Sequence, residues 1–171
     1  MPRGRLFDVC SRIGQSAMRH METCRMLIQR RLIQIEWGDC DPARTVFFPR
    51  YLEYGDACAN ALFTLAGLPK PYMFKTYNIS GIPVVDVHAR FIVPSTFGDE
   101  VDYETSAPEW GRTSFLVQHK VYRPDGVLAL EIFERRVWVV CVCEAPIQFR
   151  SEPIPEEVKK RFTDPMPSLG V

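Results

Sequence analysis

A single well-marked helix, set among segments that alternate like strands, is the feature that most limits the folds open to this chain. Pro49 suits the first helical turn, where a missing N–H leaves no bond unmade, and Gly67 suits the position just past the last turn. Between them the apolar stripe contains small residues, among them Gly55 and Ala59. Small residues let a helix axis lie close to the surface that it covers. We therefore expect one long helix packed against a curved sheet.

Five segments show the two-residue apolar periodicity of strands. They are residues 31–37, 82–93, 100–110, 114–122 and 127–143. The last segment ends in a nearly continuous apolar run, residues 137–143, as expected of a central strand buried on both faces. A short helix is expected at residues 155–162. This order predicts an α+β fold, in which a long helix packs on a five-stranded, mostly antiparallel sheet and the helices share one face.

The predicted helix is too small for the predicted sheet. A chain of 171 residues is about one domain, so one core is expected. One long helix cannot cover five strands alone, and the remaining apolar surface then needs a partner chain. The pattern therefore predicts a homodimer or homotetramer.

Charge is divided unevenly along the chain, although the formal net charge is zero. Residues 1–31 carry seven arginines against two acidic side chains, a net charge of +5, so the remainder carries −5. We interpret residues 1–30 as a basic N-terminal extension, residues 31–145 as one domain, and residues 146–171 as the proline-rich tail of that domain. Without an overall positive field, binding to nucleic acid is not expected.

Composition and motifs exclude several classes of protein. No apolar run approaches the roughly 18 residues that a membrane-spanning helix needs, so no membrane association is expected. Six cysteines without a signal peptide or a Cys-x-x-Cys pair favour reduced thiols, a cytoplasmic location and no metal site. No glycine-rich phosphate loop or Gly-x-Ser-x-Gly motif occurs, and we expect no cofactor.

The densest cluster of reactive groups is residues 38–45 (GDCDPART), which place two carboxylates and a thiol between the first strand and the helix. Loops on a rigid scaffold often carry catalytic groups. Asp39 or Asp41 also suits an Asx turn before Pro42, which is a purely structural role. From these residues alone, both interpretations stay open.

Longer stretches of the sequence favour the catalytic interpretation. Residues 35–56 (IEWGDCDPARTVFFPRYLEYGD) resemble the active-site motif of the 4-hydroxybenzoyl-CoA thioesterase family, which has the hotdog fold. The resemblance continues through residues 81–85, 97–101 and 109–115. It implies an acyl-CoA thioesterase that hydrolyses an aromatic, 4-hydroxybenzoyl-like CoA thioester to the free acid and CoA.

The resemblance implies roles for four residues. Asp41 is the nucleophile or general base, and the main-chain N–H of Phe48 at the helix start donates to the oxyanion. Asp56 meets the ring hydroxyl, and Trp110 contributes to the aromatic pocket. Arg112 is a further candidate, for contact with a CoA phosphate, because guanidinium groups suit phosphate. A solvent-facing Asp56, a core Trp110 and a solvated Arg112 are the structural alternatives.

One departure from the family pattern concerns acyl specificity. The family usually has glycine after Pro-Ala, where this chain has Arg44. A glycine there serves close approach of the substrate or a positive φ. Arg44 could narrow the acyl pocket or reach the substrate, so it bears on acyl specificity more than on the chemistry. Two alternatives to the aromatic thioesterase stay open: a thioesterase for short or medium aliphatic acyl groups, and a hotdog module that binds acyl-CoA without hydrolysing it.

Overall fold

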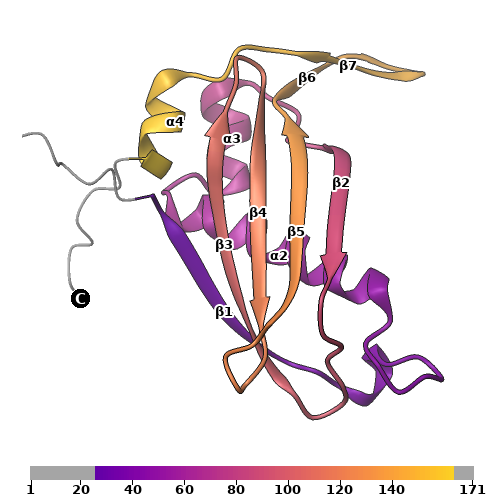
Figure 1. Ribbon diagram of the computed structural model, residues 1–171. Helices are drawn as coiled ribbons and strands as arrows, with labels where there is room; N and C mark the ends of the chain where they lie inside the picture. The colour runs from indigo at the N-terminus through magenta and orange to yellow at the C-terminus, as the bar shows by residue number, and fades with distance from the viewer. Residues whose placement is uncertain (1–25, 164–171) are drawn as a thin grey trace, which may run out of the picture.

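The computed structural model describes residues 26–163 of the chain (Figure 1). Sequence predictions that concern residues 1–25 and 164–171 lie outside the described residues. The elements follow one another as β1 (Ile28–Gln34), the 3-10 helix η1 (Trp37–Asp39), α2 (Phe48–Leu65), α3 (Lys70–Tyr77), β2 (Val84–Phe91), β3 (Glu100–Trp110), β4 (Ser114–Tyr122), β5 (Leu128–Val137), β6 (Val139–Glu144), β7 (Ile147–Ser151) and α4 (Glu156–Thr163).

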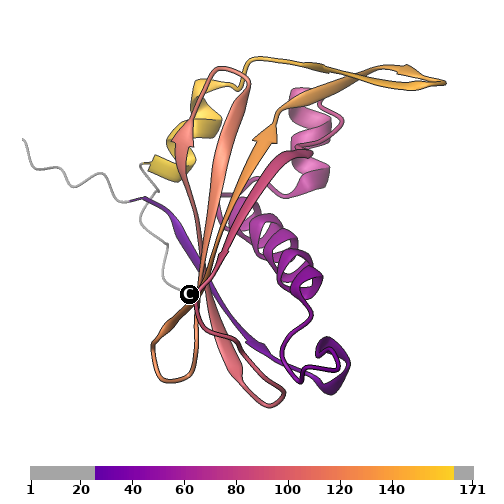
Figure 2. The same cartoon turned by 45° about the vertical axis from the view of Figure 1, so that its right-hand side comes forward.

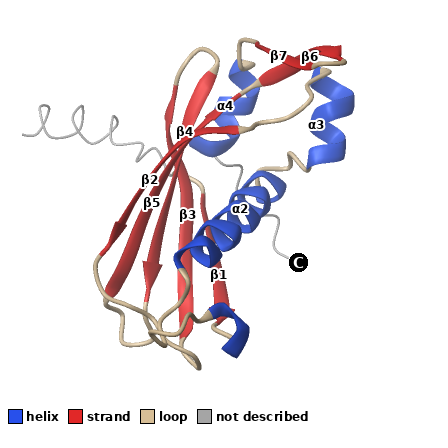
Figure 3. Cartoon of the chain, turned by 90° about the vertical axis from the view of Figure 1, so that its right-hand side faces the viewer, coloured by secondary structure: helices blue, strands red, loops and turns tan. Residues whose placement is uncertain are grey.

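Five of the strands form one sheet in the order β1-β3-β4-β5-β2. Every neighbouring pair in it is antiparallel. The helices α2, α3 and α4 lie on one face of this sheet, as the side view in Figure 3 shows. The predicted α+β fold, with a long helix on a five-stranded antiparallel sheet, is confirmed. β1 and β2 are the two edges of the sheet.

The long helix α2 has the ends that the sequence predicts. Pro49 lies in its first turn, and Gly67, with a φ of +71°, follows its last turn. Gly55 and Ala59 are both on its buried face. A Cβ at Gly55 would lie 3.4 Å from Nε2 of His119 on β4, so the missing side chain lets the middle of α2 approach the sheet closely.

The core lies between the sheet and the three helices. On β4 every second side chain is buried, including Phe115 and His119, as the predicted alternation requires. Phe162 of α4 packs against Phe63 of α2, with their ring centroids 4.8 Å apart. The C-terminal segment therefore completes one end of the core.

In the first half of the chain, β1 and α3 differ from the sequence predictions. β1 begins at Ile28, inside the predicted N-terminal extension, instead of at residue 31. The helix α3 is not predicted from the sequence. Pro71 lies in its first turn, where proline favours a helix instead of ending one. No described helix is long and apolar enough to cross a membrane.

The prediction of one central strand over residues 127–143 is confirmed as far as Val137 and wrong beyond it. β5 ends at Val137, and the apolar run after it forms β6, which pairs with β7 in a two-stranded hairpin. This hairpin projects from the end of the sheet (Figures 1 and 2). Trp138 is buried in the core, but Val142 is 50% exposed. The apolar run therefore marks a change of direction and not a strand buried on both faces.

Candidate active site

The two aspartates of the loop between η1 and α2 differ in their partners. Asp39 accepts a 2.8 Å hydrogen bond from the N–H of Glu36 and lies 3.6 Å from the guanidinium of Arg50. Asp41 accepts a 2.8 Å hydrogen bond from the N–H of Ala43 at Oδ1. Its Oδ2 has no partner among the described residues. The predicted Asx turn is therefore present at Asp41, and it orients the carboxylate while leaving one oxygen available.

The same turn gives a structural reason for the glycine that the sequence resemblance leads one to expect in place of Arg44. The N–H of Asp41 donates to the carbonyl of Thr45 (2.9 Å), and the N–H of Arg44 donates to the carbonyl of Asp41 (2.8 Å). This tight turn gives Arg44 a φ of +66°, in the left-handed region that glycine adopts most easily. Of the two reasons for a glycine, the positive φ applies.

Arg44→Gly is expected to raise the free energy of unfolding by about 1 kcal/mol. A non-glycine residue in the left-handed region is destabilised by about 1–2 kcal/mol, and the greater freedom of glycine in the unfolded chain offsets part of the gain. Asn78→Gly is the matched control, because Asn78 also has a positive φ, of +53°, but asparagine tolerates it. Urea unfolding measures both variants. An Arg44→Gly protein no more stable than wild type would contradict this prediction.

The N-terminus of α2 presents an unused hydrogen-bond donor next to this loop. The first N–H groups of a helix have no partner inside the helix, and Pro49 has no N–H. The N–H of Phe47 donates to the carbonyl of Asp39, and that of Arg50 donates to the carbonyl of Phe47. The N–H of Phe48 has no partner among the described residues. Together with the helix dipole, this N–H suits a developing negative charge.

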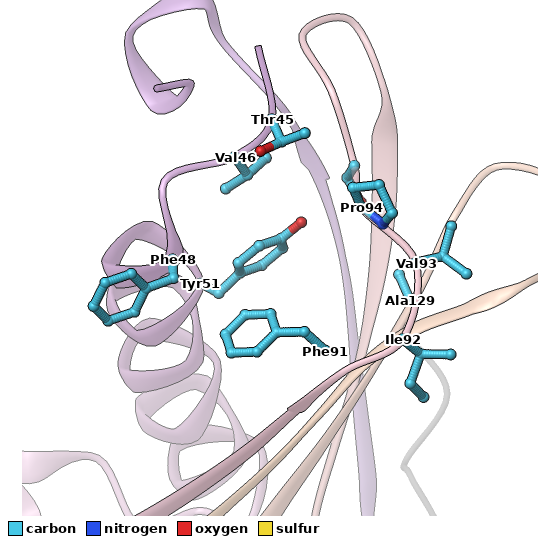
Figure 4. Close-up of a pocket in the computed structure, with 10 residues that line it drawn as sticks. Thr45, Val46, Phe48, Tyr51, Phe91, Ile92, Val93, Pro94 and Ala129 are labelled. Atoms are coloured by element: carbon cyan, nitrogen blue, oxygen red, sulfur yellow. The ribbon is translucent and has the colours of Figure 1, made fainter. Parts of the chain in front are cut away.

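A largely apolar cavity of about 400 Å³ opens beside this donor (Figure 4). Its wall includes Thr45 and Phe48 on one side and Phe91, the last residue of β2, on another. The rings of Tyr51 and Phe91 contact each other there, with centroids 6.1 Å apart. Burial raises the pKa of Tyr51, so its hydroxyl stays neutral. The carbonyl of Thr45, a residue of the cavity wall, accepts a hydrogen bond from the N–H of Asp41, so the loop that carries Asp41 adjoins the cavity.

Asp56 borders a different cavity in the single protomer. It lies eight residues beyond the first residue of α2, about 12 Å along the helix axis. Its carboxylate accepts hydrogen bonds from Nη2 of Arg136 (2.9 Å) and Nδ2 of Asn60 (3.1 Å). A cavity of about 290 Å³ is lined by Asp56, Arg136 and Val84, the first residue of β2. The structure therefore does not bring Asp41 and Asp56 together within one protomer.

The structure adds two charged residues that the sequence analysis misses. Glu134 and Arg136 face the helices from β5, and each is 3% exposed. They lie in phase with the buried Ile132, so the available signal is charge at alternating positions where apolar residues are expected. Burial raises the pKa of Glu134, but His119 and Arg136 outweigh it and hold that pKa below its ordinary value.

In the described part of the chain, no cluster of histidine, cysteine or acidic residues is arranged to hold a metal ion.

The other two predicted binding residues lie at the far end of the sheet. Trp110 stacks on Phe115 with ring centroids 4.7 Å apart, and its Nε1–H donates to the carbonyl of Ala107. Arg112 is exposed in the β3–β4 loop, and its side chain has no partner within the described part of the chain. Figure 1 places this loop at the opposite end of the sheet from the start of α2. Neither residue borders the two cavities, so the geometry favours a core role for Trp110 and a solvated Arg112.

Similarity to known proteins is consistent with this geometry. A family model described as the thioesterase-like superfamily matches residues 35–162. A 4-hydroxybenzoyl-CoA thioesterase from Pseudomonas sp. (strain CBS-3) is 39% identical over 101 residues, which are 57% of this chain and 71% of that protein. The chain belongs to the 4-hydroxybenzoyl-CoA thioesterase family. It is therefore a thioester hydrolase, as the sequence motif predicts.

Solved structures place this thioesterase among hotdog-fold enzymes. The 4-hydroxybenzoyl-CoA thioesterase of Pseudomonas sp. strain CBS-3 superposes with a TM-score of 0.71 at 31% identity, covering 78% of this chain and 98% of that one. An aspartate-to-asparagine mutant of a 4-hydroxybenzoyl-CoA thioesterase, complexed with 4-hydroxybenzoyl-CoA, gives 0.73 at 30% identity, with coverage of 80% and 99%. A gentisyl-coenzyme A thioesterase gives 0.65 at 27% identity, with coverage of 77% and 99%.

Proposed function

We propose that this thioesterase hydrolyses the CoA thioester of a hydroxylated aromatic acid, 4-hydroxybenzoate or a close analogue, to the free acid and CoA. The observation that carries the proposal is the short loop that leads from Asp41, whose carboxylate keeps one oxygen free, to the start of α2, where Phe48 borders an apolar cavity and has a free N–H. Relatives named for 4-hydroxybenzoyl-CoA and gentisyl-CoA support this acyl class, because both compounds are thioesters of hydroxylated aromatic acids.

In the proposed reaction, Asp41 acts on a carbonyl that the helix N-terminus polarises. The N–H of Phe48 donates to the thioester oxygen and stabilises the negative charge that develops there. Asp41 either adds to the carbonyl carbon, giving a mixed anhydride that water hydrolyses, or takes the proton of an attacking water. In both routes the C–S bond breaks, the CoA sulfur gains a proton, and one water is consumed.

A homodimer would complete the acyl site. β2 is an edge strand whose helix-facing Val87 and Phe91 are 43% and 55% exposed, so apolar surface lacks a cover. One cavity lies at Phe91, the end of β2, and the other at Val84, its start. We propose that two copies pair their β2 edges antiparallel about a two-fold axis. This pairing places Asp41 of one protomer near Asp56 of its partner.

Asp56→Ala is expected to lower kcat/KM for 4-hydroxybenzoyl-CoA about tenfold or more relative to benzoyl-CoA, because the ring hydroxyl loses a charged acceptor. Thiol release from the two substrates measures the ratio. Glu53→Ala is the matched control on the same helix, since Glu53 is exposed and pairs with Arg50 at 2.7 Å. Equal losses for the two substrates would remove Asp56 from recognition of the hydroxyl.

Mixed dimers test whether the site is shared between protomers. A heterodimer of one Asp41→Asn subunit and one Asp56→Ala subunit contains one site with both native carboxylates if the site spans the interface. We expect isolated heterodimers to recover about half of the wild-type turnover of 4-hydroxybenzoyl-CoA, with wild-type selectivity. If each site lies within one protomer, no site has both carboxylates, and the selectivity stays at that of the Asp56→Ala protein.

We further propose a cytoplasmic location. The four cysteines in the described part of the chain, Cys40, Cys58, Cys141 and Cys143, form no disulfide. Burial raises the pKa of Cys58 to about 11, so this thiol stays protonated and unreactive. Free thiols of this kind are typical of proteins in reducing compartments.

A further inference from the structure

Asp56 is hydrogen-bonded to a buried cluster of charged side chains on β5, formed by Arg136 and Glu134. Nη2 of Arg136 lies 2.9 Å from Oδ1 of Asp56 and 2.7 Å from Oε2 of Glu134. Nε of Arg136 lies 2.9 Å from the same oxygen of Glu134. The side chains of Arg136 and Glu134 are each 3% exposed, whereas that of Asp56 is 56% exposed. Only the Asp56 end of the cluster is therefore open to a ligand.

The sheet and the helix fix this cluster from both sides. His119 is fully buried, its Nε2 lies 3.6 Å from Oε2 of Glu134, and its Nδ1 lies 2.9 Å from Oγ1 of Thr105. A Cβ at Gly55 would lie 3.4 Å from Nε2 of His119 and 3.5 Å from Oε1 of Glu134. The missing side chain keeps this turn of α2 against the cluster. Asp56, the next residue, is thereby held within reach of Arg136.

The charges of the cluster determine which groups of a ligand can donate a hydrogen bond to Asp56. One guanidinium serves two carboxylates, and Glu134 takes two of the three hydrogen bonds. Asp56 therefore receives one oriented bond from Arg136 and keeps anionic lone pairs for the cavity. An oriented, anionic acceptor in the wall of a cavity suits a neutral donor such as a hydroxyl group.

We propose that Arg136 is a positioning residue for acyl selectivity, which orients Asp56 toward the hydroxyl of the acyl group without contacting the thioester. This inference rests on the proposed role of Asp56 in recognising that hydroxyl. It places a determinant of acyl preference on β5, beneath the helix that carries the recognising carboxylate.

The test measures the ratio of kcat/KM for 4-hydroxybenzoyl-CoA to kcat/KM for benzoyl-CoA by thiol release. Arg136→Met is expected to lower this ratio about tenfold, as Asp56→Ala does. Because Arg136 acts through Asp56, a protein with both substitutions should show the loss of one alone and not the product of the two. Arg136→Lys keeps the charge and should restore part of the ratio.

Two further variants keep the result interpretable. Arg135→Met removes the neighbouring arginine, which points to the other face of β5 and pairs with Glu109 at 2.9 Å. Its ratio should equal that of wild type. If Arg136→Met does not fold, the charge-neutral combination of Glu134→Gln with Arg136→Gln replaces it, with the same expected loss.

The outcomes distinguish the positioning role of Arg136 from the proposed role of Asp56 on which it rests. A wild-type ratio in the Arg136 variants, with a lowered ratio in Asp56→Ala, would overturn the inference and leave the proposed function standing. Multiplied losses in the combined Arg136→Met and Asp56→Ala protein would also overturn it, because Arg136 would then act independently. A wild-type ratio in Asp56→Ala would overturn the proposed role of Asp56, and the inference with it.

Discussion

An Asp41→Asn protein is expected to release thiol from 4-hydroxybenzoyl-CoA with a kcat lower by on the order of 10³-fold and a KM within about threefold of wild type. Asparagine has nearly the shape of aspartate, and its side-chain oxygen can still accept from the N–H of Ala43. The turn and the fold therefore remain. What is lost is the charge that attacks the carbonyl or takes a proton from water. Steady-state thiol release measures the loss, and thermal unfolding checks the fold.

Asp39 offers the matched control, two residues earlier in the same loop. Its carboxylate is already bonded to the N–H of Glu36 and lies near Arg50. Asp39→Asn is therefore expected to keep kcat within about fivefold of wild type. Loss of activity in Asp39→Asn, with retention in Asp41→Asn, would move the catalytic carboxylate from Asp41 to Asp39.

Arg136→Met is expected to lower the free energy of unfolding by about 3–5 kcal/mol, the largest effect on stability that we predict. The substitution leaves Glu134 as a buried carboxylate that has lost its ion pair with Arg136 and keeps only the 3.6 Å contact with His119 among the ion pairs of the described residues. Burying a charge without a full partner is costly, because water no longer solvates it. Guanidinium unfolding at neutral pH measures the loss.

Two variants test whether the loss of stability comes from the unpaired Glu134 and not simply from removing an arginine of β5. Arg135→Met breaks a partly exposed ion pair with Glu109 and is expected to change stability by less than about 1 kcal/mol. The combination of Glu134→Gln with Arg136→Gln removes both charges and should lose less stability than Arg136→Met. A stability of Arg136→Met equal to that of Arg135→Met would show that Glu134 finds another partner.

The strands that the sequence predicts most closely are those with one buried face. Residues 100–110 and 114–122 coincide with β3 and β4, because the alternation of buried and exposed positions is itself the two-residue period. The run after Val137 fails for a physical reason. Apolar residues without alternation indicate burial but not direction, so Trp138 and Val139 are buried while the chain leaves the sheet to form β6.

Some residues of the candidate site are close together in the sequence, and others come together only through the fold. Asp41 and the helix start at Phe48 are neighbours in the sequence, so their motif could be recognised without a structure. Asp56 and Arg136 are separated by 80 positions, and their contact depends on how α2 lies over β5. Trp110, matched by the motif, is the last residue of β3 and packs, partly buried, against the core, which motif spacing alone does not show.

The most direct measurement is thiol release by the wild-type, full-length chain from 4-hydroxybenzoyl-CoA, benzoyl-CoA and hexanoyl-CoA. We predict that kcat/KM is highest for 4-hydroxybenzoyl-CoA and about tenfold or more above that for benzoyl-CoA. A highest value for hexanoyl-CoA would indicate a thioesterase for aliphatic acyl groups and contradict the proposed substrate. Thermal stabilisation by these thioesters without release of thiol would contradict catalysis by Asp41 itself.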